Sequence, residues 1–245
     1  MRDLIKLLLV TVTTMVLVGC SSSNSSNVDN TVPDSPTGGN GAIDLTNYEK
    51  VPLSEEQKYS LAYMWHEEKL AKEIYLELNK INPAKQLENI ANNAEVMHIE
   101  LVQNLVEWYD INITNLANYE IRYSAAELAN MPVGKFAVPE IEDLYNTLYD
   151  YGRVSTQASL EVGCMVEVTD ITDLDKYIAG ASGNQAMLDT FNILRDGSYN
   201  HYWSFDSGLK NMGIADGCCS LGAEYCHPEY PNNENGGGNG NGNRR

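Results

Sequence analysis

The sequence predicts an all-α fold: a bundle of four main helices with an extra helix in the crossover connection between the second and the third. Apolar residues recur at spacings of three and four over long stretches, as in helices with one buried face. The alternation of apolar and polar residues that marks strands is almost absent. Prolines and glycines fall between the helical stretches, where they separate one helix from the next.

The first two main helices are predicted over residues 54–82 and 86–109. Ser54 and Gln57 stand three apart, as in a capping box that begins a helix, and Pro83 ends the first helix. Both stretches carry a clear apolar stripe. We therefore expect each of them to bury one face against the rest of the bundle.

The remaining helices follow a long connection over residues 112–135, in which a short helix is predicted at 124–130. Pro139 begins a helix that stops near Gly152. The third main helix is predicted over residues 155–178. A turn at 180–183 then leads into the fourth main helix, whose buried face is predicted to contain Leu188, Phe191, Leu194, His201 and Phe205.

The N-terminus predicts a lipoprotein signal peptide. Arg2 and Lys6 precede an apolar run over residues 7–18, which is too short to span a bilayer but suits the core of a secretory signal. Leu17-Val18-Gly19-Cys20 resembles the bacterial lipobox, in which the cysteine becomes lipidated and N-terminal after cleavage. We therefore expect residues 1–19 to be removed and Cys20 to be lipidated. The alternative is an ordinary signal peptide with a chance cysteine.

Three further segments follow the predicted anchor. Residues 20–47 consist almost entirely of polar residues, glycine and proline, which predicts a disordered tether. Residues 48–231 are the predicted folded domain, and the Gly- and Asn-rich residues 232–245 are a predicted disordered tail. Ser21 follows the anchor cysteine, which favours lipid attachment at the outer membrane of the cell envelope, with the domain on its periplasmic or surface face.

The charge of the chain argues against two classes of partner. It has 16 Lys and Arg against 34 Asp and Glu, a net charge of −18. Such a chain repels nucleic acid and anionic membrane surfaces, so the predicted lipid anchor is its expected contact with a membrane. An acidic surface attracts cations such as ferrous iron, although simple solvation of an exported protein is the favoured explanation of the charge.

Four cysteines remain after Cys20. Their even number in an oxidising compartment predicts one or two disulfides. Cys218 and Cys219 are adjacent, so a bond from either one to Cys226 is predicted. The alternative is a metal site of these three residues with His227. Cys164 is expected to be a small core residue.

The candidate functional residues are ionisable groups on or beside apolar stripes: Glu68 on the first helix, Glu95 and His98 on the second, and Glu167 on the third. Buried carboxylates are unfavourable unless they are paired or bind metal. Glu95 and His98, three apart, can approach one point. Di-metal helical bundles use such Glu-x-x-His pairs together with carboxylates from facing helices.

Several motifs resemble known families. Residues 68–75 and 89–98 are similar to the first two helices of rubrerythrin-type ferritin-like proteins. Gly134-Lys135-Phe136 and Gly197-Ser198-Tyr199-Asn200-His201, with residues 67–71 and 161–171, more closely resemble the uncharacterised bacterial family called domain of unknown function 2202. The resemblance implies a ferritin-like four-helix bundle.

The resemblance also implies a centre with two iron ions, or manganese instead, in which Glu95 bridges and His98 and His201 each bind one ion. One departure stands out: Ser198 occupies the place of the glutamate that the wider superfamily has on its fourth helix. Asp170, three residues after Glu167, is expected to supply that carboxylate, or else to be an ordinary carboxylate at a helix end. The expected metal ligands are Glu68, Glu95, His98, Glu167, Asp170 and His201.

Two functions are compatible with this site. The first is a di-iron oxidoreductase acting on peroxide, oxygen or ferrous iron. The second is a non-catalytic helical binding or scaffold lipoprotein at the cell envelope, favoured by the missing glutamate on the fourth helix. We further expect Glu67 to be exposed, Glu161 to be a reserve ligand, and Tyr75 to lie in the core or donate to a ligand carboxylate.

Overall fold

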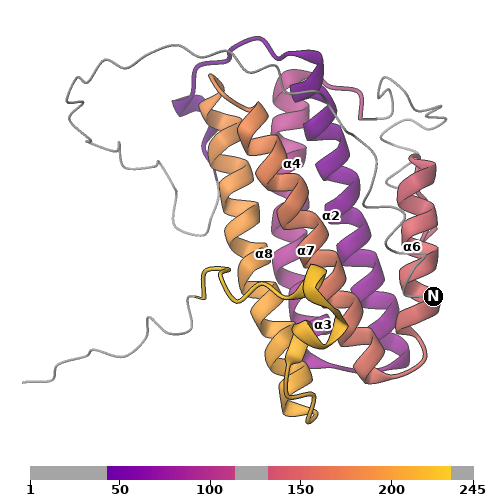
Figure 1. Ribbon diagram of the computed structural model, residues 1–245. Helices are drawn as coiled ribbons and strands as arrows, with labels where there is room; N and C mark the ends of the chain where they lie inside the picture. The colour runs from indigo at the N-terminus through magenta and orange to yellow at the C-terminus, as the bar shows by residue number, and fades with distance from the viewer. Residues whose placement is uncertain (1–42, 114–131, 233–245) are drawn as a thin grey trace, which may run out of the picture. The chain divides into compact units, whose positions relative to one another are not determined.

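The computed structural model describes residues 43–113 and 132–232, all within the compact unit Ser35–Arg245. The predicted all-α class is confirmed, since the described residues form helices and turns, with only an isolated bridge residue at Ile43. Figure 1 shows the long helices side by side. The main elements are α2 (Glu55–Ile81), α3 (Lys85–Asn89), η2 (Ile90–Ala94), α4 (Glu95–Tyr109), α6 (Pro139–Gly152), α7 (Thr156–Gly180) and α8 (Gln185–Asn211).

Helix α2 begins with the capping box that the sequence predicts. The Ser54 hydroxyl accepts from the Gln57 backbone N–H, and the Gln57 side chain accepts from the Ser54 N–H. These bonds satisfy two donors that the first turn of a helix leaves free. The apolar side chains of α2 that the bundle buries completely include Leu61, Met64, Ile74, Tyr75 and Leu78.

The second predicted helix is not continuous. The chain from 85 to 109 is α-helical at both ends, but residues Ile90–Ala94 form a π-helical turn, η2, directly before Glu95. Such a turn inserts one extra residue into the helical repeat and is found often at functional sites. Helix α4 ends at Tyr109, and the following residue, Asp110, adopts the left-handed conformation (φ 55°) typical of helix ends.

Four helices enclose the core. Helix α2 packs against α4 and α7, and α8 packs against the same two helices from the opposite side. Helices α2 and α7 are antiparallel, because Gln57 near the start of α2 bonds to the Gly180 carbonyl at the end of α7. Helix α6 lies in the connection between α4 and α7 and packs against α2 and α7 (Figure 1). The extra helix in the connection is therefore present.

Part of the predicted tether is ordered, which corrects its expected end at residue 47. Residues Leu45–Asn47 form a 3-10 turn, η1, in which Asp44 accepts from the Thr46 N–H. Tyr48 then donates a 2.8 Å hydrogen bond to Asp189 of α8, so this segment is tied to the bundle. The sequence signal for disorder is compositional and does not register these two specific bonds.

Several predictions fall on residues that the structure leaves undescribed. They are the signal peptide, the lipidation of Cys20, the tether before residue 43, the short helix at 124–130 and the tail from 233. Among the helices of residues 43–113 and 132–232, none is long and apolar enough to cross a membrane.

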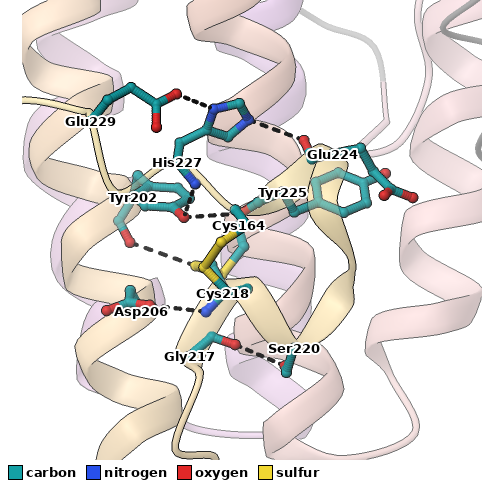
Figure 2. The surroundings of a disulfide bond; sticks show 12 residues. Cys164, Tyr202, Asp206, Gly217, Cys218, Ser220, Glu224, Tyr225, His227 and Glu229 are labelled. Atoms are coloured by element: carbon teal, nitrogen blue, oxygen red, sulfur yellow. Dashed lines mark hydrogen bonds and ion pairs between the residues drawn. A yellow bond between two sulfur atoms is a disulfide. The ribbon is translucent and has the colours of Figure 1, made fainter.

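The C-terminal segment contains two disulfide-bonded cysteine pairs, one of which joins it to the bundle. Cys219 pairs with Cys226, one of the two predicted alternatives, while Cys218 pairs with Cys164 of α7. Figure 2 shows the second bond beside Tyr202 of α8. Cys164 is fully buried, as expected of a core residue, but it also forms a disulfide. The alternative prediction, a metal site of the three C-terminal cysteines with His227, is wrong because all three sulfurs lie in disulfides.

Candidate metal centre

Five of the six predicted ligands meet within the bundle. Glu68 comes from α2, Glu95 and His98 from α4, Glu167 from α7 and His201 from α8. Each is at most 7% exposed. Every long helix of the bundle thus contributes at least one ionisable side chain to a buried polar cluster, and these five residues are called the centre below.

The Glu95 carboxylate lies between the two histidines. Its Oε1 is 3.2 Å from His201 Nδ1, and its Oε2 is 3.5 Å from His98 Nδ1. Each histidine also approaches one carboxylate of its own. His98 Nδ1 is 3.2 Å from Glu68 Oε2, and His201 Nδ1 is 3.4 Å from Glu167 Oε2. The centre therefore has two similar halves that share Glu95.

Local structure places Glu95 and His98 together. They stand one helical turn apart at the start of α4, immediately after the π-helical turn. Because that turn inserts a residue into the repeat, it rotates α4 relative to α3. This is the physical reason why a pair that falls beside the apolar stripe in a continuous helix is almost wholly buried in the structure.

Two small residues on α8 complete the site. A Cβ atom at Gly197 would collide with His98 Nε2, so a glycine there makes room for the imidazole. Ser198 donates a 2.6 Å hydrogen bond to Asp170 Oδ2 of α7. Ser198, which occupies the position of the missing glutamate on α8, is thus hydrogen-bonded to an acidic side chain of the neighbouring helix. Asp170 is 8% exposed and lies deep in α7, so it is not a carboxylate at a helix end.

Tyr75 fulfils both expectations stated for it. Its ring is fully buried and packs against Phe205, with centroids 5.1 Å apart. Its hydroxyl donates a 2.6 Å hydrogen bond to Glu167 Oε1. The other oxygen of Glu167 is the one near His201, so Tyr75 holds this carboxylate in its orientation toward the centre.

Burial and mutual charge change the proton affinities in the centre. Burial raises the pKa of Glu68 and of Glu167, and raises the pKa of Asp170 to about 7 with help from the charge of Glu167. Burial also opposes the charge on His201, but the carboxylates of Glu167 and Glu95 outweigh it and raise its pKa to about 10. Without cations, the centre therefore retains protons near neutral pH.

Glu95 differs from the other carboxylates. Burial alone would raise its pKa, but hydrogen bonds from His201 and His98 outweigh burial and hold the pKa well below its usual range. The shared carboxylate is consequently ionised, as a bridging ligand must be.

The residues of the centre could hold divalent cations. Glu95, His98 and His201 each offer a ligand atom, and these atoms lie within 4.8 Å of one another. Glu68 Oε1 is buried without a hydrogen-bond partner in the described structure, which is unfavourable unless something binds it. The carboxylates of Glu68, Glu95, Glu167 and Asp170 together balance the charge of two divalent ions. Carboxylate oxygen with imidazole nitrogen suits iron or manganese.

Two acidic residues differ from expectation. Glu67 is only 9% exposed, so its predicted exposure is wrong; the packing of α7 over this side of α2 buries it. Glu161, the reserve ligand, instead accepts hydrogen bonds from Tyr151 and Gln157, away from the histidines. Sequence reasoning also gave no role to Gly197, although a glycine inside a helical pattern signals a close approach.

The comparisons with known proteins agree with one another. The model of the family described as "Uncharacterized protein domain (DUF2202)" matches residues 57–224. The chain is 33% identical over 169 residues to uncharacterized protein MJ0754 of Methanocaldococcus jannaschii, covering 69% of this chain and 83% of that protein. The crystal structure of hypothetical protein MJ0754 superposes with a TM-score of 0.58 at 34% identity, covering 67% of this chain and 86% of the other. The chain therefore belongs to the DUF2202 family.

Proposed function

We propose that the described helices form a ferritin-like four-helix bundle that binds two metal ions, preferentially iron. The observation that carries the proposal is the position of Glu95 between His98 and His201, with a further carboxylate beside each histidine. This resembles the donor arrangement of di-metal carboxylate bundles, in which side chains from facing helices share two ions, except that α8 has Ser198 where they have a second Glu-x-x-His glutamate.

The two halves of the centre indicate which side chains would bind each ion. Glu68 and His98 would hold one ion, Glu167 and His201 the other, and Glu95 would be shared. Asp170 adds negative charge at the centre and is oriented by Ser198. Tyr75 donates to the Glu167 oxygen that faces away from His201, which leaves the other oxygen free to bind.

We further propose an oxidoreductase that acts on peroxide, oxygen or ferrous iron. When bound, two iron ions would supply the electrons for such chemistry. The chain's own contribution is to bury the donors away from bulk water and to orient them before any ion binds. The Tyr75 hydroxyl, fixed on Glu167, lies beside the centre as a hydrogen-bond donor.

We place this domain at the cell envelope as a lipoprotein. Cys20 would carry the lipid, and the tether would separate the bundle from the membrane. The two disulfides support export, because such bonds persist in oxidising compartments and are rare in the cytosol.

Metal content is the direct test. The chain is purified without chelator or histidine tag, loaded anaerobically with ferrous iron, and measured by mass spectrometry. We expect about two ions per chain, and loss of both in a Glu95→Ala/His98→Ala variant. Glu161→Ala, a buried carboxylate outside the centre, is the matched control. Substoichiometric metal in the loaded wild type would remove the di-metal proposal and leave a helical scaffold.

Catalysis needs its own measurement. With excess ferrous iron as the electron donor, peroxide and oxygen consumption by the iron-loaded chain is compared with that of Glu95→Ala, while circular dichroism follows the helices. Lost turnover with intact helices supports a catalytic centre. Metal binding that stabilises the wild type without turnover on any of the three substrates would show that the ions are structural.

A further inference from the structure

A second pair of acidic side chains lies beside the centre. Glu67 of α2 and Asp173 of α7 share a side-chain hydrogen bond. Glu67 is more than nine-tenths buried, and its Oε2 has no hydrogen-bond partner among the described residues. A buried carboxylate oxygen without a partner is unfavourable, and a cation is the ligand that would satisfy it.

This pair lies between solvent and the centre. Asp173 is partly exposed, Glu67 is buried, and the charges of Asp170 and Glu68 both act on Glu67. Asp170 precedes Asp173 by one turn of α7, and Glu68 follows Glu67 directly on α2. The seam between these two antiparallel helices therefore carries carboxylates from a partly exposed position to the ligands of the centre.

A surface groove lies at the outer end of the same seam. It has a volume of about 440 Å³ and lies where α2 begins and α7 ends. Its lining includes the exposed carboxylates of Glu55 and Glu56, the exposed ammonium of Lys176 and the buried Tyr177 ring. Tyr177 follows Asp173 by one turn of α7, so its ring lies between the groove and the acidic pair along this helix.

We propose that Glu67 and Asp173 form a transient binding site for divalent cations, through which ions pass from the groove to the centre. The inference rests on the proposed di-metal function. Oxygen atoms alone offer a borderline divalent ion a weaker site than carboxylate and imidazole together. Ions held at Glu67 and Asp173 therefore move on to the centre. The exposed carboxylates of Glu55 and Glu56 at the groove also raise the local concentration of cations and the rate at which they associate.

Cobalt(II) loading of the metal-free full chain tests this route without redox chemistry. Stopped-flow absorption in the visible region follows the rate, and equilibrium titration gives the number of ions bound. We expect Glu67→Gln and Asp173→Asn to slow loading by roughly tenfold while leaving about two ions per chain at equilibrium. Glu161→Gln, which removes a buried charge outside the seam, should load like the wild type.

The outcomes separate the two proposals. A wild type that binds no cobalt would contradict the di-metal function itself. A wild type that binds two ions, with variants that load equally fast, would overturn only the route. Loss of an ion at equilibrium in the variants would also overturn it, because Glu67 or Asp173 would then be a ligand of the centre. Asp173 is partly exposed, so we expect Asp173→Asn to fold. This variant can therefore test the route even if Glu67→Gln fails to fold.

Discussion

Two sites on α7 lie one helical turn apart and affect the stability of the fold in opposite ways. Glu167 belongs to the centre, where ionisable groups from four helices are buried together. Cys164, three residues earlier, forms a disulfide with Cys218 of the C-terminal segment (Figure 2). That segment is tied down further by Tyr202, which donates to the Tyr225 carbonyl and accepts from the His227 N–H.

The difference shows how one bundle can contain a proposed metal site that lowers the stability of the metal-free fold. Buried carboxylates are unfavourable until cations neutralise them, so the centre weakens the metal-free fold. A disulfide acts on the unfolded chain instead and is indifferent to the charge of the core. We therefore expect the two regions to respond to different perturbations.

The largest expected effect is a loss of stability of the metal-free chain as the pH rises. Folding raises the pKa of His201 from 6.5 to about 10 and that of Asp170 from 3.8 to about 7. In both cases the folded state binds protons more tightly than the unfolded state, so this stabilisation is complete at low pH and is lost as the pH rises through the folded pKa. Each tenfold change in proton affinity corresponds to about 1.4 kcal/mol, so the total reaches several kcal/mol.

Chemical unfolding between pH 5 and pH 10 of chelator-treated chain measures this loss. Glu95, whose pKa is lowered, contributes in the opposite sense only at more acidic pH. Metal-loaded chain is the control, because cations replace protons and their stabilisation should grow with pH. A flat profile for the metal-free chain would show that the centre does not retain its protons.

The next largest effect is expected from the disulfides. The Cys164–Cys218 bond closes 54 residues and the Cys219–Cys226 bond only 7. Chain entropy predicts that replacing the first pair by serine lowers the free energy of unfolding by about 4 kcal/mol, against about 2 kcal/mol for the second pair. Guanidinium unfolding measures both, each variant being the control for the other. If the free energy of unfolding lost in either variant changed with pH or with bound metal, the disulfides and the centre would not act independently.

The smallest effect is expected from Gly197→Ala. The added methyl group collides with the His98 ring, so we expect a loss of about 1–3 kcal/mol from overpacking, together with weaker metal binding. Gly180→Ala, whose Cβ meets nothing within 4 Å, is the matched control and should be neutral or slightly stabilising. Metal titration and thermal unfolding of both variants check this. Equal behaviour of the two would show that His98 has space to move.

Much of the centre was predictable because its signals are local. Glu68 lies on the apolar stripe of its helix, and Glu95 and His98 stand one helical turn apart beside the stripe of theirs. The pattern within each helix therefore already indicated that these ionisable residues face the core. Glu67 was not predictable, since its neighbour Glu68 occupies the stripe and a single helix cannot bury both. Only the packing of α7 over α2 does so.

The sequence by itself determined the helical class, the order and approximate limits of the helices, and the residues whose burial calls for a cation, because these depend on spacings of three and four within one segment. The tertiary structure decided the π-helical turn before Glu95, the contact of Gly197 with His98, the bond from Ser198 to Asp170 and the pairing of Cys164 with Cys218. Each of these joins or orients separate helices. Their relative register is set by the packing of the whole core, which no local spacing encodes.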